Sequence, residues 1–134
     1  MARYSNHPSL AGLLSGLLLL CLLASCQEGA DAGRLFGQWR LGGTTTEYIS
    51  FSGPLAVFRS SSDPGRQVFG NYQHHGDSLF IQCYSIHGQA ADTTLVEDRF
   101  GMRPLSDIRL HVDVLAADHI QLSSHGRSWV LHKY

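Results

Sequence analysis

The chain has little lysine and no cluster of basic residues. Lys133 is its only lysine, its nine arginines are scattered, and the formal net charge at pH 7 is −1. Domains that bind nucleic acids normally carry a clustered basic excess that neutralises phosphates. We therefore expect no nucleic-acid partner.

Cysteine is also scarce, and several catalytic motifs are missing. Only Cys21, Cys26 and Cys83 are present, which is too few for a disulfide framework. The sequence has neither a Gly-x-Ser-x-Gly elbow nor a glycine-rich phosphate motif. The adjacent acids Glu97 and Asp98 point in different directions on any regular element, so they form no paired-carboxylate site. We expect a non-catalytic protein without a cofactor.

The chain does have enough apolar material for one folded domain. Its 134 residues are 43% hydrophobic and 16% charged. This length allows one ordinary domain. High apolar content with a net charge near zero also excludes a disordered chain.

The longest apolar segment is residues 10–23, which contain no charge. Fourteen residues at about 1.5 Å each give roughly 21 Å, short of a hydrocarbon core of about 30 Å. Arg3 precedes this segment and small residues follow it. The pattern predicts a secretory signal peptide rather than a membrane-spanning helix.

The end of this segment, Leu23-Ala24-Ser25-Cys26, resembles the lipobox of bacterial lipoproteins. The resemblance implies that residues 1–25 are a cleaved lipoprotein signal peptide and that Cys26 carries acyl chains. Several acyl chains would hold the protein on a membrane persistently.

The residues after the lipobox set the expected location and the start of the domain. Gln27 stands where an inner-membrane retention signal would have aspartate, so we expect the outer membrane or the cell surface. Residues 26–33 would be the lipidated cysteine and a flexible, acidic tether. Residues 34–134 would form the folded domain.

Residues 34–134 alternate between short apolar segments and turn signals. The sequence predicts strands at 35–41, 47–51, 55–59, 67–73, 78–84, 107–114, 119–123 and 128–133. Residues 93–101 predict one or two helical turns that end at Gly101. This spacing predicts an all-β fold, an antiparallel meander closed as a barrel or packed as a sandwich.

Two patterns bear on which strand faces are buried. Ile108, Leu110, Val112 and Val114 alternate with polar residues, which predicts one buried face. The strands at 67–73 and 78–84 carry apolar residues on both faces. Such strands are either covered on both sides or line a cavity with one face.

The start of the first strand, Phe36-Gly37-Gln38-Trp39, is similar to the Gly-x-Trp signature of lipocalins. The resemblance implies a small antiparallel up-and-down β-barrel whose closed end is plugged by Trp39. It also implies a cation near the last strand that packs on the Trp ring. Arg127 and Lys133 are the two candidates, and we take Arg127 with Gly37 and Trp39 as the barrel signature.

Six aromatic residues are candidates for the lining of an apolar pocket inside such a barrel: Tyr48, Phe58, Phe69, Tyr72, Phe80 and Tyr84. The alternative is that aromatic side chains simply fill a small barrel.

Histidines and Cys83 are the remaining reactive groups. His111, His119 and His132 could converge on neighbouring strands as a zinc site would need, but solvent-facing histidines are the simpler interpretation, and we expect no metal. Cys83 lies in a strand interior and is expected to be a buried, inert thiol rather than a nucleophile activated by His87.

Two functions from different classes fit these features. The first is a cell-envelope lipoprotein whose lipocalin-like barrel binds a small hydrophobic molecule or lipid. The second is an accessory or scaffold subunit that binds a protein partner in an envelope complex. The irregular stretch 86–105 is the candidate lid or partner-binding loop. A packed barrel interior would count against the first function.

Overall fold

The fold is taken from a computed structural model, which describes residues 33–84 and 90–134. The predicted signal peptide, Cys26, the tether up to residue 32 and His87 lie outside the described residues. Predictions about them therefore remain predictions. Within the described part of the chain, no helix is long and apolar enough to cross a membrane.

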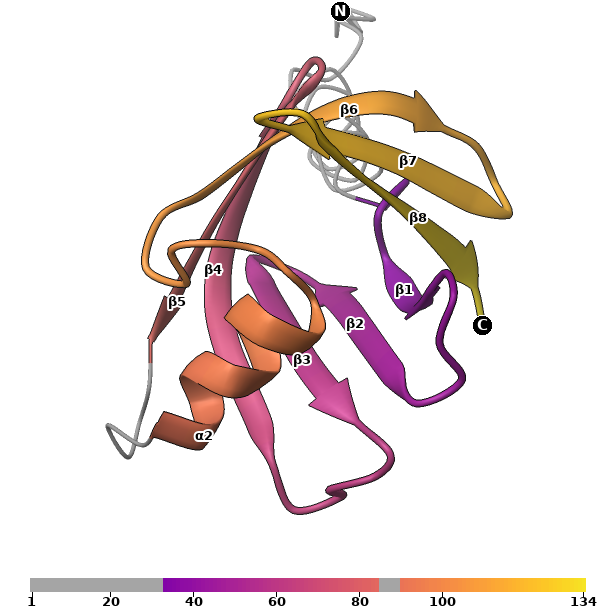
Figure 1. The fold of residues 1–134 in the computed structure, drawn as a ribbon. Coiled ribbons are helices and arrows are strands. Elements are labelled where there is room, and N and C mark those ends of the chain that lie inside the picture. The colour runs from indigo at the N-terminus through magenta and orange to yellow at the C-terminus, as the bar shows by residue number, and fades with distance from the viewer. Residues whose placement is uncertain (1–32, 85–89) are drawn as a thin grey trace, which may run out of the picture. The chain divides into compact units, whose positions relative to one another are not determined.

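Eight antiparallel strands form one closed barrel in the order of the sequence (Figure 1). They are β1 (Gly37–Leu41), β2 (Glu47–Ser52), β3 (Leu55–Ser60), β4 (Gln67–His75), β5 (Ser78–Tyr84), β6 (Ile108–Leu115), β7 (His119–Ser124) and β8 (Arg127–Lys133). β1 pairs with both β2 and β8, which closes the barrel. All eight predicted strands and the predicted all-β barrel are confirmed.

Alternation along each strand places one set of side chains inside the barrel. On β2, for example, Ile49 and Phe51 are buried while Ser50 between them is partly exposed. Inward-facing apolar residues of all eight strands belong to one hydrophobic cluster. The core therefore fills the space that the barrel encloses.

The prediction that Val114 shares the buried face of β6 is wrong. The register between β6 and β7 shifts between Val112 and Val114, so that Val112 pairs with Leu122 and Val114 pairs with Gln121. Such a bulge inserts one extra residue and reverses the side-chain alternation beyond it. Val114 is consequently 37% exposed, and Leu115 packs against the core instead.

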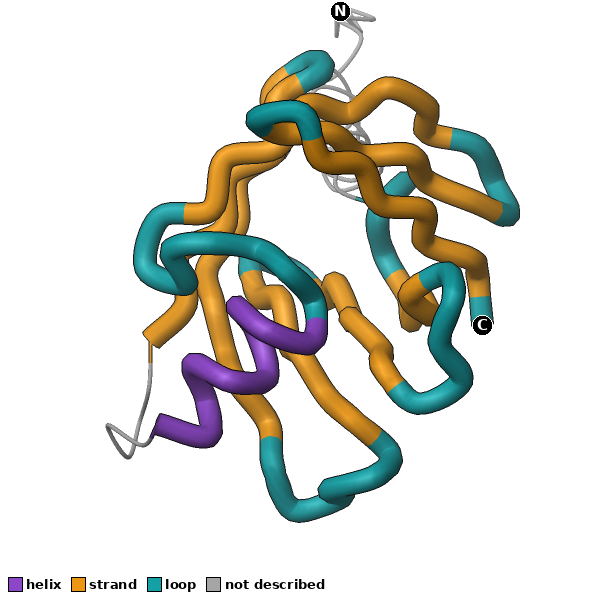
Figure 2. Tube along the Cα trace, in the orientation of Figure 1, coloured by secondary structure: helices purple, strands orange, loops and turns teal. Residues whose placement is uncertain are grey.

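A helical segment interrupts the strands between β5 and β6 (Figure 2). It consists of α2 (Ala90–Thr93) and a π-helical continuation, η1 (Thr94–Arg99). Gly101 follows with φ +72°, a conformation that glycine adopts without strain. The predicted helical turns are confirmed, although the helix begins three residues before the predicted start. We call residues 90–102 the lid segment.

Candidate functional site

One end of the barrel is closed by the residues of the Gly-x-Trp signature. Trp39 is fully buried, and its indole N–H donates to the carbonyl oxygen of Leu35 at 2.9 Å. The Lys133 ammonium lies 4.5 Å from the centre of the Trp39 ring and donates to the carbonyl oxygen of Phe36 at 2.6 Å. A Cβ atom on Gly37, which has φ +122°, would overlap the Lys133 ammonium. Glycine at this position thus allows the cation to reach the indole.

The cation over Trp39 is therefore Lys133 and not Arg127. β8 runs from Arg127 at one end of the barrel to Lys133 at the other, and only Lys133 pairs in register with Trp39. Arg127 donates instead to the carbonyl oxygen of Gly101 at 3.0 Å. The choice of Arg127 as part of the signature is corrected to Lys133.

The lid segment covers the opposite end of the barrel. Connections in an up-and-down barrel alternate between its two ends, so the turns β1–β2, β3–β4 and β7–β8 lie at the same end as the lid segment. Four apolar side chains of the segment, those of Leu95, Val96, Phe100 and Met102, are at most 3% exposed. The Phe100 ring meets the inward-facing Phe58 edge-on, with 4.9 Å between ring centres. The lid segment thus completes the core at the end of the barrel opposite Trp39.

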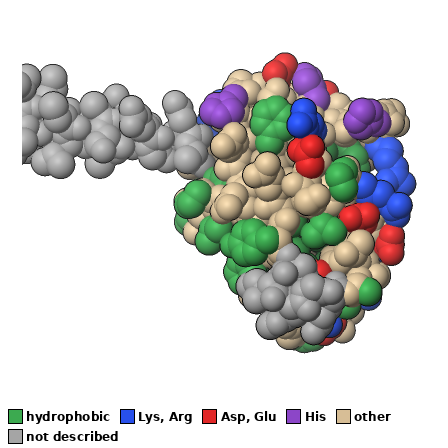
Figure 3. Space-filling view, turned by 90° about the vertical axis from the view of Figure 1, so that its left-hand side faces the viewer, with side chains coloured by type: hydrophobic (Ala, Val, Ile, Leu, Met, Phe, Trp, Pro, Cys, Tyr) green, Lys and Arg blue, Asp and Glu red, His purple; other side chains and the backbone are tan. Residues whose placement is uncertain are grey.

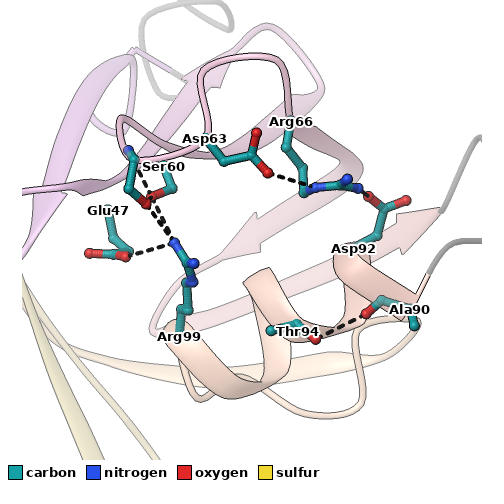
Figure 4. A network of polar contacts seen from close by, with 9 residues as sticks. Glu47, Ser60, Asp63, Arg66, Ala90, Asp92, Thr94 and Arg99 are labelled. Atoms are coloured by element: carbon teal, nitrogen blue, oxygen red, sulfur yellow. Dashed lines mark hydrogen bonds and ion pairs between the residues drawn. The ribbon is translucent and has the colours of Figure 1, made fainter.

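Two arginines attach the lid segment to the rim of the barrel (Figure 4). Arg99 donates to the hydroxyl groups of Ser60 and Ser62 at 3.1 and 2.8 Å, and its guanidinium lies 3.6 Å from the buried Glu47 carboxylate. On the other side, Arg66 of the β3–β4 turn forms an ion pair with Asp92 at 3.1 Å.

A cavity of about 120 Å³ lies between these attachments. It is lined by Ser60, Asp63, Arg66, Ala91, Thr94, Leu95 and Arg99. Binding pockets for small molecules commonly measure about 300–1,000 Å³. This cavity is too small for such a ligand.

The structure divides the six predicted pocket aromatics between the two faces of the barrel wall. Phe58 is fully buried in the core, and Tyr72 is half-buried with its ring against Phe51, 4.9 Å between centres. The other four alternate out of phase with the core and lie on the outer surface: Tyr48, Phe69, Phe80 and Tyr84. Of the six, only Phe58 and Tyr72 face the barrel interior, where they pack with the core, because strand register decides which apolar face of β4 and β5 turns inward.

The outer wall carries a groove that is larger than the cavity at the lid segment. This groove, of about 330 Å³, crosses β4, β5 and the start of β6 and is lined by Asn71, Gln73, Phe80, Gln82, Asp107 and Arg109. Figure 3 looks at the side of the molecule on which β5 lies in Figure 1 and shows hydrophobic side chains (green) among other side chains and backbone (tan). We call these six residues the wall groove.

The three strand histidines do not converge, which removes the alternative of a zinc site built from them. His119 pairs with His132 on β7 and β8, whereas His111 on β6 pairs with Ser123 at the far end of β7. Within residues 33–84 and 90–134, no group of three or more His, Cys, Asp or Glu side chains is placed to hold a metal ion.

Cys83 is buried at the lid end of β5, and burial raises the pKa of its thiol to about 12. At neutral pH such a thiol carries almost no thiolate, which is the nucleophilic form. The prediction of a buried thiol is confirmed.

Sequence reasoning missed the polar attachment of the lid segment. One signal was available, because Glu47 is in phase with the buried residues Ile49 and Phe51 and is therefore an acid on an inward-facing position. Its partner Arg99 is not signalled by any local pattern. The wall groove was missed as well, since its residues look like ordinary solvent-facing positions of strands.

Comparison with known proteins defines the fold class. Neither a protein-family model nor a curated protein matches the sequence. Two solved structures are similar. A lipocalin-like protein from Bacteroides uniformis ATCC 8492 has a TM-score of 0.61 at 18% identity, and an uncharacterized protein from Bacteroides eggerthii DSM 20697 has 0.57 at 20% identity. Each likeness covers 75% of this chain and 99% of the other chain.

These likenesses establish a lipocalin-like fold, as the Gly-x-Trp signature predicted.

Proposed function

We propose that this chain is a non-catalytic binding protein of the bacterial cell envelope, anchored by lipid on Cys26, and that its barrel binds through its outer surface. The lipobox resemblance supports the anchor and a location at the outer membrane or cell surface. One observation carries the choice of the outer surface: the barrel interior is packed, while four of the six candidate aromatics lie outside.

The cost of opening the lid end argues against an interior ligand. Burial of each large apolar side chain contributes about 1.5–3 kcal/mol. Leu95, Val96, Phe100 and Met102 together contribute about 6–12 kcal/mol, which is close to the whole stability of a typical domain at about 5–15 kcal/mol. The lid segment is thus part of the hydrophobic core, and opening it would cost much of the free energy of folding.

A second candidate function is carriage of a small hydrophobic molecule inside the barrel. The attachment of the lid segment favours it, because Arg66 and Arg99 hold the segment by polar contacts at its edges. A ligand that replaced the four apolar side chains of the segment would recover their burial energy. The alternative function, an accessory subunit of an envelope complex, falls under the main proposal, because such a subunit would bind its protein partner through the outer surface.

Two measurements test the proposal. Labelled palmitate should be incorporated into the full-length protein and not into Cys26→Ser, and incorporation into the variant would contradict the anchor. Native mass spectrometry after incubation with bacterial lipid extract should show no retained lipid beyond the anchor.

A retained fatty acid or similar molecule would instead support carriage. Arg99→Ala then locates that molecule, because loosening the lid segment should change the affinity of an interior ligand and leave an outer-surface ligand unaffected. Arg103→Ala is the matched control, since the partners of Arg103 among the described residues are the Glu97 carbonyl and the exposed Asp98, which both belong to the lid segment itself.

A further inference from the structure

We infer that the wall groove is a binding site for a neutral carbohydrate, a short glycan with uncharged sugar units. This inference rests on the proposed binding by the outer surface and names the class of ligand. It depends on how the six groove residues are arranged and on what each of them can bind.

The groove residues form two rows across three neighbouring strands. In one row Asn71 of β4 pairs with Gln82 of β5, and in the other Gln73 pairs with Phe80, which pairs with Arg109 of β6. Side chains directly opposite each other in a sheet lie about 4.5–5.5 Å apart. The three amides, on β4 and β5, therefore lie beside one aromatic ring, and Arg109 of β6 lies on the other side of that ring.

The three amides are available to a ligand. Asn71, Gln73 and Gln82 are exposed, and within the described part of the chain their side chains make no hydrogen bond. Each amide offers two donors and one acceptor oxygen. Sugar hydroxyls also donate and accept at once. A group of amides therefore suits them better than it suits a ligand that has acceptors alone.

Phe80 and the ion pair beside it define the rest of the ligand. The Phe80 ring is half-buried at the floor of the groove, and a sugar ring can place its C–H face on such a ring. The Arg109 guanidinium lies 6.0 Å from the centre of the Phe80 ring, and its Nε contacts both Asp107 oxygens at 3.1 and 3.3 Å. Because Asp107 neutralises Arg109, the groove has no net charge to attract an anion.

Other ligand classes fit these features less well. An apolar molecule would cover three amides without pairing them, which costs free energy. An extended peptide would bind best by adding to a free strand edge, and each strand of this closed barrel already has two neighbours. The groove volume of about 330 Å³ is at the small end of the range for ligand sites, which fits a short glycan.

The experiment uses the full-length protein in a detergent without a sugar headgroup, because an alkyl glycoside would compete for the groove. The probes are maltotriose, cellotriose, xylotriose and mannotriose, with trigalacturonic acid as the charged comparison. Saturation-transfer NMR and titration calorimetry up to about 10 mM would detect a Kd of about 1 mM. At least one neutral trisaccharide should bind, and it should bind more tightly than the charged one.

Two variants place the ligand in the groove. Gln82→Ala removes one amide and Phe80→Leu removes the ring while keeping an apolar side chain, and each should weaken binding about 10-fold without changing the melting temperature. Gln121→Ala is the matched control, because Gln121 is an exposed glutamine on the outer face of β7 and should leave binding unchanged.

Three outcomes would overturn the inference: no neutral trisaccharide binds, the charged one binds more tightly, or binding persists in both groove variants. None of these outcomes contradicts binding of a protein partner by the outer surface. A lipid retained inside the barrel would contradict the proposed function instead. The two failures are therefore distinguishable.

Discussion

Each end of the barrel is closed by a tryptophan and a basic side chain that donate hydrogen bonds to two consecutive carbonyl oxygens, but the segments that carry these oxygens differ. At the closed end the Trp39 indole and the Lys133 ammonium donate to the consecutive carbonyl oxygens of Leu35 and Phe36. At the lid end the Trp129 indole donates to the carbonyl oxygen of Phe100 at 2.6 Å, and Arg127 donates to that of the next residue, Gly101.

The difference between the ends lies in burial and in the length of the covering segment. At the closed end Trp39 is fully buried and the cation stacks on its ring, whereas at the lid end Trp129 is only half-buried. The lid segment also needs the ion pairs of Arg66 and Arg99 with the rim. The comparison indicates that Trp39, a residue of strand β1, closes one end. The lid segment, which lies between β5 and β6 and is held by additional ion pairs, closes the other.

Replacing the two tryptophans should give the largest effect and the most direct test of this comparison. Trp39→Ala should lower the free energy of unfolding by about 3–5 kcal/mol, since it leaves a cavity in the core. Trp129→Ala should cost less, about 1–3 kcal/mol, because it removes one hydrogen bond and a partly exposed ring. Urea denaturation of both variants measures the difference.

Trp39→Phe keeps most of the volume and guards against failure of Trp39→Ala to fold. Its free energy of unfolding should lie between those of the wild type and Trp39→Ala. Equal losses at Trp39 and Trp129 would show that the two ends are closed equally firmly, and the comparison would fail.

Cys83 provides a chemical probe of the lid end. With its pKa raised to about 12 by burial, its thiolate fraction at pH 8 is lower than that of an ordinary cysteine by about three orders of magnitude. Iodoacetamide should therefore leave Cys83 unmodified in the folded protein and modify it in denaturant, as peptide mass mapping would show. Rapid modification of the native protein would mean that the lid end opens readily.

Arg99→Ala should weaken the lid end by a smaller amount. The substitution leaves the buried Glu47 carboxylate without its cation, which costs about 1–3 kcal/mol. It should also raise the rate of Cys83 alkylation and the hydrogen-exchange rate of residues 90–99. Arg103→Ala, whose partner Asp98 is exposed, should cost less than about 1 kcal/mol. If both variants behave alike, the rim contacts do not hold the lid segment.

The closed end was predictable from the sequence, and most of the lid end was not. Strand alternation, turn residues and the Gly37-x-Trp39 spacing are local patterns, so they predicted eight strands and the plug. The choice between Arg127 and Lys133 depended on which end of β8 pairs with β1, which local sequence does not specify. The same lack of register information misplaced Phe69 and Phe80, because β4 and β5 have apolar residues on both faces.

The lid segment shows a second limit. Its helical turns and Gly101 stop were predictable, because helix and stop signals are local. Its place over the barrel depends on Phe100 meeting Phe58 and on Arg99 meeting Glu47, residues that are far apart in the sequence. The wall groove likewise exists only once register has aligned Asn71 with Gln82.

The smallest expected effect is a difference between the two ends in how their stability depends on pH. At the closed end the β4–β5 turn is tied to β6 by His111, whose ring lies 2.7 Å from Asp113 and 2.9 Å from Asp77. These two hydrogen bonds, that to Asp113 first, raise the pKa of His111 above its usual value of about 6.5. Since the folded-state pKa is the higher one, the stabilisation is full below about pH 6.5 and is lost as the pH rises through the folded pKa.

His111→Asn and Asp77→Asn should therefore lower the melting temperature at about pH 5.5 and have no effect at about pH 9. The rim contacts at the lid end should show no such dependence over this range, because their cations are the arginines Arg66 and Arg99, which stay charged. The methyl signals of Leu95 and Val96 in NMR spectra should accordingly not shift while His111 titrates. Lid signals that titrate together with His111 would mean that the two ends are coupled through the barrel wall, and the division between them would have to be given up.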